Sequence, residues 1–185
     1  MENRILAVIA GFIAMAFIAI AYFVKNKKYY LLFQLLCIVF LIISYFFTAQ
    51  YFAMVGLAVG LFRTVTFYVY ESKDKKAPLY WPFIFSVLTL TSYLVVDYCI
   101  LKTAEPLDVL CLIALIMFAF IFRIRNLKIV RFTMLIPTIL SILFNLLTQA
   151  VLFATLTYVI EFSANVVSIF KYHVFNKETK KQKSL

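Results

Sequence analysis

Seven apolar stretches, each long enough to cross a bilayer as a helix, constrain this chain more than any other feature. A transmembrane helix needs about 20 mostly apolar residues to cross about 30 Å of hydrocarbon. The stretches span residues 5–24, 29–47, 51–70, 79–101, 106–122, 129–147 and 150–171. We therefore predict an all-α membrane protein with seven transmembrane helices, in which residues 1–173 form one domain and residues 174–185 a basic cytoplasmic tail.

The composition limits the function classes that such a chain can belong to. Hydrophobic residues make up 65% of it and charged residues only 14%, with a mean hydropathy of +1.01, which is too apolar for a soluble fold. Cys37, Cys99 and Cys111 lack any redox or metal-binding spacing, and His173 is the single histidine, so we expect no cofactor and no metal. Nucleotide-binding and hydrolase motifs are absent, so we expect no enzyme activity.

The basic residues predict the orientation in the membrane. All but Arg4, Arg63 and Lys102 of the 18 lysines and arginines lie in or next to the loops after the first, third and fifth stretches or the tail after the seventh. Cytoplasmic loops retain positive charge, so the N-terminus is expected outside and the C-terminus in the cytoplasm of a bacterial inner membrane. The net charge of +10 then reflects topology and attraction to anionic lipids rather than nucleic-acid binding.

Two parts of the chain share one loop pattern at an offset of 100 residues. Asn26 and Lys28 fall on Asn126 and Lys128, and residues 5–70 and 106–172 both contain a basic loop followed by a short uncharged turn. A single stretch, 79–101, separates them, so both parts enter the membrane from the same side. We predict a 3+1+3 bundle of parallel repeats, the arrangement of SWEET transporters.

Two charges of opposite sign occur far inside apolar stretches, and each needs a partner or a wet cavity there. Arg63 and Glu161 lie on the third and seventh stretches, at depths that differ by only about 3 Å. We hypothesise that they form an ion pair beside Asn145 and Asn165 and line a central polar cavity. In the alternative, Arg63 extends along the helix to the cytoplasmic surface.

Polar residues at helical spacing on the sixth stretch extend this hypothetical site. The candidate solute-binding residues are Arg63, Thr138, Ser141, Asn145, Glu161 and Asn165. Three alternatives stay open: ordinary hydrogen bonding between helices, a static ion-pair clamp between the repeats, and proton uptake by Glu161 that couples transport to protons.

Short motifs across nearly the whole chain resemble one family. They are Phe62-Arg63-Thr64, Phe122-Arg123 with Leu127 and Arg131, Asn145, Glu161, Asn165 and Ile169-Phe170-Lys171. These residues are similar to those of the YgjV family of bacterial inner-membrane proteins, whose architecture resembles SWEET, PQ-loop and nicotinamide-riboside transporters. The chain departs from those transporters because it lacks the Pro-Gln pair and has a mid-helix proline, Pro137, only in its sixth stretch.

The resulting expectation is a transporter for a small polar solute that the sequence does not identify. In that case Asn165→Ala should abolish transport without unfolding the protein. The competing expectation is a membrane receptor or interaction scaffold on the same bundle, and a third is a purely structural membrane protein. The oligomeric state is left open, a homo-oligomer included.

Overall fold

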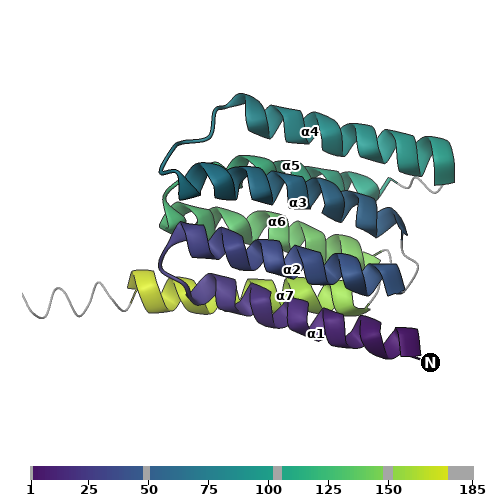
Figure 1. Cartoon of the computed structure of the whole chain (residues 1–185), viewed down its shortest axis with the longest axis horizontal. Helices are drawn as coiled ribbons and strands as arrows, with labels where there is room; N and C mark the ends of the chain where they lie inside the picture. Colours follow the sequence, from purple (N-terminus) through teal and green to yellow (C-terminus); the bar gives the residue numbers. More distant parts are fainter. Residues whose placement is uncertain (1, 48–50, 102–105, 148–151, 175–185) are drawn as a thin grey trace, which may run out of the picture.

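The computed structural model describes residues 2–47, 51–101, 106–147 and 152–174, which form seven α-helices (Figure 1). The helices are α1 (Glu2–Phe23), α2 (Lys27–Phe47), α3 (Tyr51–Ser72), α4 (Tyr80–Tyr93), α5 (Asp108–Phe122), α6 (Leu127–Leu147) and α7 (Leu152–Ile169). These described ranges contain no strand, which confirms the all-α class. The expected basic tail and the uncharged turns at 48–50 and 148–149 lie outside the described residues.

Two of the expected helices change their winding near one end. The stretch expected as one helix over 79–101 is α-helical only to Tyr93, and it continues as a π-helix, η1 (Leu94–Leu101). The last helix likewise continues from α7 into a short π-helix, η2 (Phe170–Val174). Apolar length predicts that a stretch is helical but carries no information about winding, because α- and π-helices both satisfy the backbone internally.

The helices pack side by side with their axes roughly aligned (Figure 1). Along the chain α1 contacts α2, α2 contacts α3, α5 contacts α6 and α6 contacts α7. Two further contacts, α1 with α7 and α3 with α5, close these six helices into a ring. Helix α4 lies outside the ring, against α3 and α5, and so takes no part in enclosing the centre.

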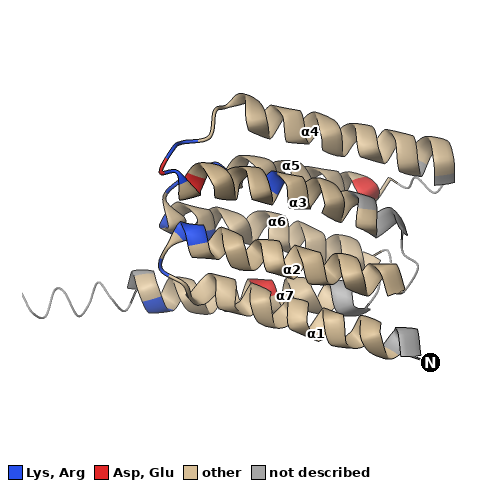
Figure 2. Cartoon of the chain, viewed as in Figure 1, with Lys and Arg blue, Asp and Glu red and all other residues tan. Residues whose placement is uncertain are grey.

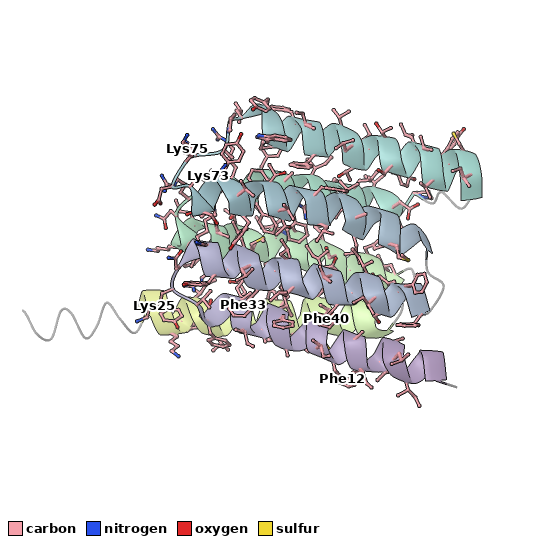
Figure 3. All side chains as sticks on the ribbon, in the orientation of Figure 1. Phe12, Lys25, Phe33, Phe40, Lys73 and Lys75 are labelled. Carbon is pink, nitrogen blue, oxygen red and sulfur yellow. The ribbon has the colours of Figure 1, made fainter. Side chains whose placement is uncertain are left out.

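The inner and outer faces of α1 show how sequence sets this packing. Ala7, Ala14 and Ala21 are buried, as expected for a helix whose small residues allow close approach. The hydroxyl of Ser44 on α2 donates a 2.8 Å hydrogen bond to the Ala7 carbonyl oxygen. Phe12 points away from the bundle and is 60% exposed (Figure 3). Such exposed apolar side chains suit a helix that faces lipid.

Length and apolar character allow four of the described helical stretches to cross a membrane. They are Ile5–Phe23, Lys27–Phe47, Tyr80–Ile100 and Leu127–Leu147, and α5 is a shorter apolar helix. The lysines and arginines of the described loops gather at one end of the bundle (Figure 2). The Lys25 side chain lies at the same end as those of Lys73 and Lys75 (Figure 3).

Candidate functional site

The ring of six helices lines a partly open cavity of about 190 Å³. One wall is apolar and includes Leu115, Phe118 and Phe122 of α5. Most of the polar groups that line the cavity come from α2, α3, α6 and α7: Gln34, Arg63, Ser141, Asn145, Thr157, Tyr158 and Glu161. A space with one apolar side and several convergent polar groups is typical of a small-molecule site.

Glu161 is held by two donors that both contact the same carboxylate oxygen. Oε1 accepts a 2.7 Å hydrogen bond from the Tyr22 hydroxyl and a 3.4 Å bond from Nε2 of Gln34. The described residues provide no hydrogen bond to Oε2. Glu161 is only 5% exposed, so its remaining acceptor capacity is directed into the interior.

Tyr22 and Gln34 belong to a hydrogen-bonded chain that joins α1, α2 and α7. Gln34 also donates to the Tyr30 hydroxyl at 3.2 Å, and Tyr30 donates to the Tyr22 hydroxyl at 3.4 Å. The Tyr30 ring meets Tyr22 and Phe122 edge to face, with centroids 5.4 and 6.4 Å away. This network fixes the carboxylate of Glu161 at the cavity wall.

Sequence reasoning missed both donors. Gln34 carried a usable signal, because an amide inside an apolar stretch marks a face that meets protein or water. Tyr22 carried none, since a tyrosine near the end of an apolar helix is common at the membrane interface.

Arg63 of α3 is buried beside the apolar part of the lining that α5 provides. Nη1 donates a 3.0 Å hydrogen bond to the carbonyl oxygen of Leu115, and Nε has no partner. The guanidinium carbon lies 5.6 Å from the centroid of Phe118 and 5.2 Å from that of Phe122. Because the side chain is 5% exposed and bonded to α5, the alternative in which it extends to the surface is wrong.

The direct ion pair expected between Arg63 and Glu161 is also wrong. The two side chains line the same cavity, but the structure forms salt bridges instead between Lys27 and Glu71 and between Arg125 and Asp74. Equal depth in two helices does not fix their distance across a bundle. Here the cavity separates α3 from α7. Arg63 forms its hydrogen bond with α5, and Glu161 forms its hydrogen bonds with α1 and α2.

The other four candidate residues divide into two groups. Ser141 and Asn145 line the cavity, and the described residues form no hydrogen bond to either side chain. Thr138 instead donates to the Met134 carbonyl oxygen of its own helix at 2.7 Å. Asn165 is fully buried and donates to the Arg131 carbonyl oxygen at 2.8 Å, which ties α7 to α6. Thr138 and Asn165 are not among the residues that line the cavity.

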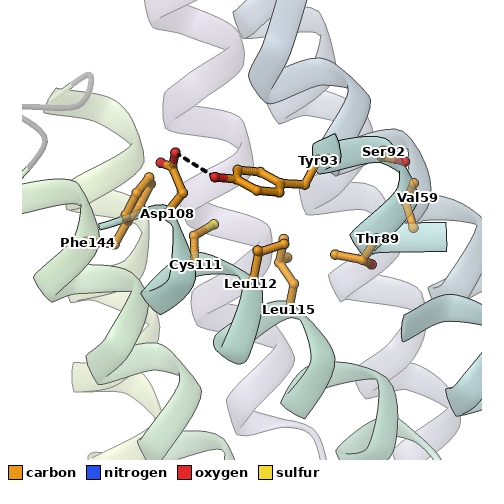
Figure 4. Close-up of a pocket in the computed structure, with 10 residues that line it drawn as sticks. Val59, Thr89, Ser92, Tyr93, Asp108, Cys111, Leu112, Leu115 and Phe144 are labelled. Atoms are coloured by element: carbon orange, nitrogen blue, oxygen red, sulfur yellow. Dashed lines mark hydrogen bonds between the residues drawn. The ribbon is translucent and has the colours of Figure 1, made fainter. Parts of the chain in front are cut away.

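A smaller pocket of about 40 Å³ adjoins the cavity between α3, α4 and α5 (Figure 4). Gly56, Cys111, Leu115 and Phe144 line both spaces. In this pocket the hydroxyl of Tyr93 donates to Oδ2 of Asp108 at 3.3 Å (Figure 4). A Cβ atom built on Gly56 would meet nothing within 4 Å, so this glycine leaves open space where the two pockets meet.

A ring of apolar helices around a partly polar cavity defines a helical integral membrane protein. The described side chains include no cluster of His, Cys, Asp or Glu that could hold a metal ion. The chain belongs to the Imp-YgjV family, described as a bacterial inner membrane protein, whose sequence model matches residues 5–175. It is therefore a protein of the bacterial inner membrane. No curated protein and no solved structure matches the chain.

Proposed function

We propose that this protein is a transporter that moves a small polar solute through the central cavity. The observation that carries the proposal is the unused hydrogen-bonding capacity around the cavity. Arg63, Ser141, Asn145 and Glu161 all line it. Nε of Arg63 has no partner, the described residues form no hydrogen bond to the Ser141 or Asn145 side chain, and both hydrogen bonds to Glu161 go to Oε1. Buried polar groups in proteins are nearly always hydrogen-bonded, so a cluster of unsatisfied ones fits a site that a ligand completes.

The cavity volume limits the size of the solute. Drug-sized ligands occupy pockets of about 300–1,000 Å³, whereas this cavity measures about 190 Å³. The proposed solute is therefore a molecule with only a few non-hydrogen atoms beyond its polar groups. A larger solute would require the ring of helices to widen.

A duplicated architecture would provide the movement that transport requires. Asn26 Oδ1 accepts from the Lys28 backbone N–H at 2.9 Å, and Asn126 Oδ1 accepts from that of Lys128 at 3.0 Å, 100 residues further on. The same turn thus begins α2 and α6. Together with the position of α4 outside the ring, this supports a 3+1+3 arrangement of parallel repeats, in which one half rocks against the other.

The proposed orientation places the basic end of the bundle in the cytoplasm. Basic residues at that end include Lys25, Lys73 and Lys75 (Figure 3). Positive charge is retained on the cytoplasmic side and also attracts anionic lipid headgroups. The N-terminus would then face the periplasm.

Counterflow in proteoliposomes tests the transport proposal. Wild-type protein loaded with unlabelled solutes from a panel of small polar metabolites should accumulate at least one labelled counterpart. Asn145→Ala should slow that exchange by about tenfold or more, because it removes an amide that only a solute would use. Thr138→Ala on the same helix is the matched control and should exchange like the wild type. Absence of exchange for the whole panel, or equal rates in both variants, would contradict the proposal.

A receptor or interaction scaffold is the second candidate, and one feature favours it. At the basic end an open hollow of about 550 Å³ is lined by five basic residues, Lys25, Lys27, Arg125, Lys128 and Arg131, and by one acidic residue, Glu71, which pairs with Lys27. Such a hollow suits an acidic segment of a partner protein. Under this function, Lys128→Glu would abolish capture of the partner from the cytoplasm, while Asn145→Ala would leave it unchanged.

A further inference from the structure

The guanidinium of Arg63 has far fewer hydrogen-bond acceptors around it than it has N–H donors. An arginine side chain carries five N–H donors in a planar fork. The described residues offer them a single acceptor, the carbonyl oxygen of Leu115 at 3.0 Å, and the buried Nε has none. Phe118 and Phe122 lie near the guanidinium on the α5 side, so they contact it without accepting a conventional hydrogen bond. The group remains competent to bind an oxyanion such as a carboxylate.

The surroundings of Arg63 leave room for such a group. Nη2 lies 3.6 Å from the place where a Cβ atom of Gly60 would be, one helical turn away on α3. Because residue 60 is a glycine, no side chain covers this side of the guanidinium. Gly60 lines the same cavity as Arg63.

Glu161 offers the complementary charge on the far wall. Its Oε1 is occupied by Tyr22 and Gln34, while Oε2 has no hydrogen-bond donor among the described residues. A carboxylate oxygen directed at a buried space accepts an ammonium group well.

The two charges line one cavity and form no salt bridge with each other. Burying an unpaired charge is costly, and a solute with a single charge would pair with one of these residues and leave the other unpaired. A neutral solute would leave both unpaired. A molecule that carries both charges satisfies both residues at once.

We propose that the cavity binds a small zwitterion, with its oxyanion group at Arg63 and its ammonium group at Glu161. This inference rests on the proposed transport through the cavity and specifies the class of solute. Asn145 and Ser141 supply further hydrogen bonds from α6 to the same ligand. Amino acids and amino sulfonates of modest size belong to this class.

Thermal unfolding of the purified protein with matched small molecules tests the inference directly. The probes are α-alanine, β-alanine and γ-aminobutyrate, which space the two charges differently, together with propionate, propylamine and glycerol. At least one of the three zwitterions should raise the Tm, with an apparent affinity about tenfold or more above that for propionate or propylamine. A larger shift with propionate, propylamine or glycerol than with every zwitterion would overturn the inference.

Charge-neutralising variants show which residue binds the oxyanion and which binds the ammonium group of the ligand. Glu161→Gln should bind propionate as well as it binds the best zwitterion, since the ammonium no longer gains an ion pair. Arg63→Gln should bind neither propionate nor the zwitterion. Glu71→Gln and Arg123→Gln, which change the same residue types outside the cavity, are the matched controls and should keep the wild-type preference. A wild-type preference retained in Glu161→Gln and Arg63→Gln would overturn the assignment.

The two proposals fail in different ways. Counterflow of a neutral or singly charged solute, lost in Asn145→Ala, would support transport and overturn the zwitterion. Binding of a zwitterion without any counterflow would support the ligand class and overturn transport. Because the wild-type ligand series needs no variant, the inference stays testable even if Arg63→Gln fails to fold.

Discussion

The hydroxyl of Tyr22 on α1 donates a 2.7 Å hydrogen bond to Oε1 of Glu161 on α7, across 139 residues of sequence. This contact fixes the cavity-facing carboxylate and also joins the first and last helices of the ring. The Tyr22 hydroxyl therefore helps both to close the ring of helices and to position Glu161 in the proposed site.

Tyr22→Phe should therefore lower the stability of the protein and leave its fold unchanged. Removing the donor leaves a buried carboxylate with one long hydrogen bond, at a cost of about 1–3 kcal/mol in the free energy of unfolding. Denaturation of the purified protein in detergent measures the change. Tyr29→Phe is the control, because Tyr29 is 52% exposed. Equal stability of the two variants would show that the Tyr22 contact contributes nothing.

Asn145→Ala and Asn165→Ala should affect different properties. Asn165 bonds to the Arg131 carbonyl oxygen and is fully buried, so its loss should lower stability by about 1–3 kcal/mol. Asn145 has no such bond among the described residues, so its loss should reduce solute exchange at nearly unchanged Tm. Unfolding and counterflow measured on both variants check this separation, and the opposite pattern would contradict it.

Arg131→Gln should lower the stability of the protein much more than Arg125→Gln. Nη2 of Arg131 donates to the carbonyl oxygens of Tyr22 and Val24 at 3.0 and 2.6 Å, which ties α6 to the end of α1. Charged hydrogen bonds of this kind contribute about 1.5–3 kcal/mol each. Arg125 instead pairs with an Asp74 side chain that is 94% exposed, a contact worth about 0–1 kcal/mol. In thermal unfolding the Tm of Arg131→Gln should be lower than that of Arg125→Gln.

Substitutions of Gly56 test whether solute passes through the open space beside this residue. Gly56→Ala should keep full activity and gain up to about 1 kcal/mol of stability, since alanine is the better helix former and its Cβ meets nothing within 4 Å. Gly56→Phe should fill the space where the cavity and its neighbouring pocket meet and stop solute exchange. Counterflow by Gly56→Phe at the wild-type rate would show that solute does not pass this point.

Cysteine labelling tests the orientation. In a background with Cys37, Cys99 and Cys111 replaced by serine, cysteines are introduced at Pro106 and Lys75, which are exposed near opposite ends of the bundle. A membrane-impermeant maleimide should label the Pro106→Cys protein in intact spheroplasts. It should label the Lys75→Cys protein only after lysis. The reverse pattern would place the basic end outside.

The sequence alone determined the class of this protein because the signals for that class are local. The length of each apolar stretch predicts a helix, and the all-α class is confirmed by the structure. Family membership likewise follows from the sequence and is confirmed over residues 5–175. Seven crossings and the duplicated architecture remain predictions.

Only the tertiary structure decided which polar groups meet. Asn145 and Asn165 look equivalent in sequence, yet one lines the cavity and the other joins two helices. Arg63 and Glu161 lie at similar depth, yet they bond to other neighbours, Leu115 for the first and Tyr22 and Gln34 for the second. The physical reason is that burial of a helix in lipid fixes its position along the membrane normal, whereas its rotation and neighbours depend on close packing and polar contacts between helices.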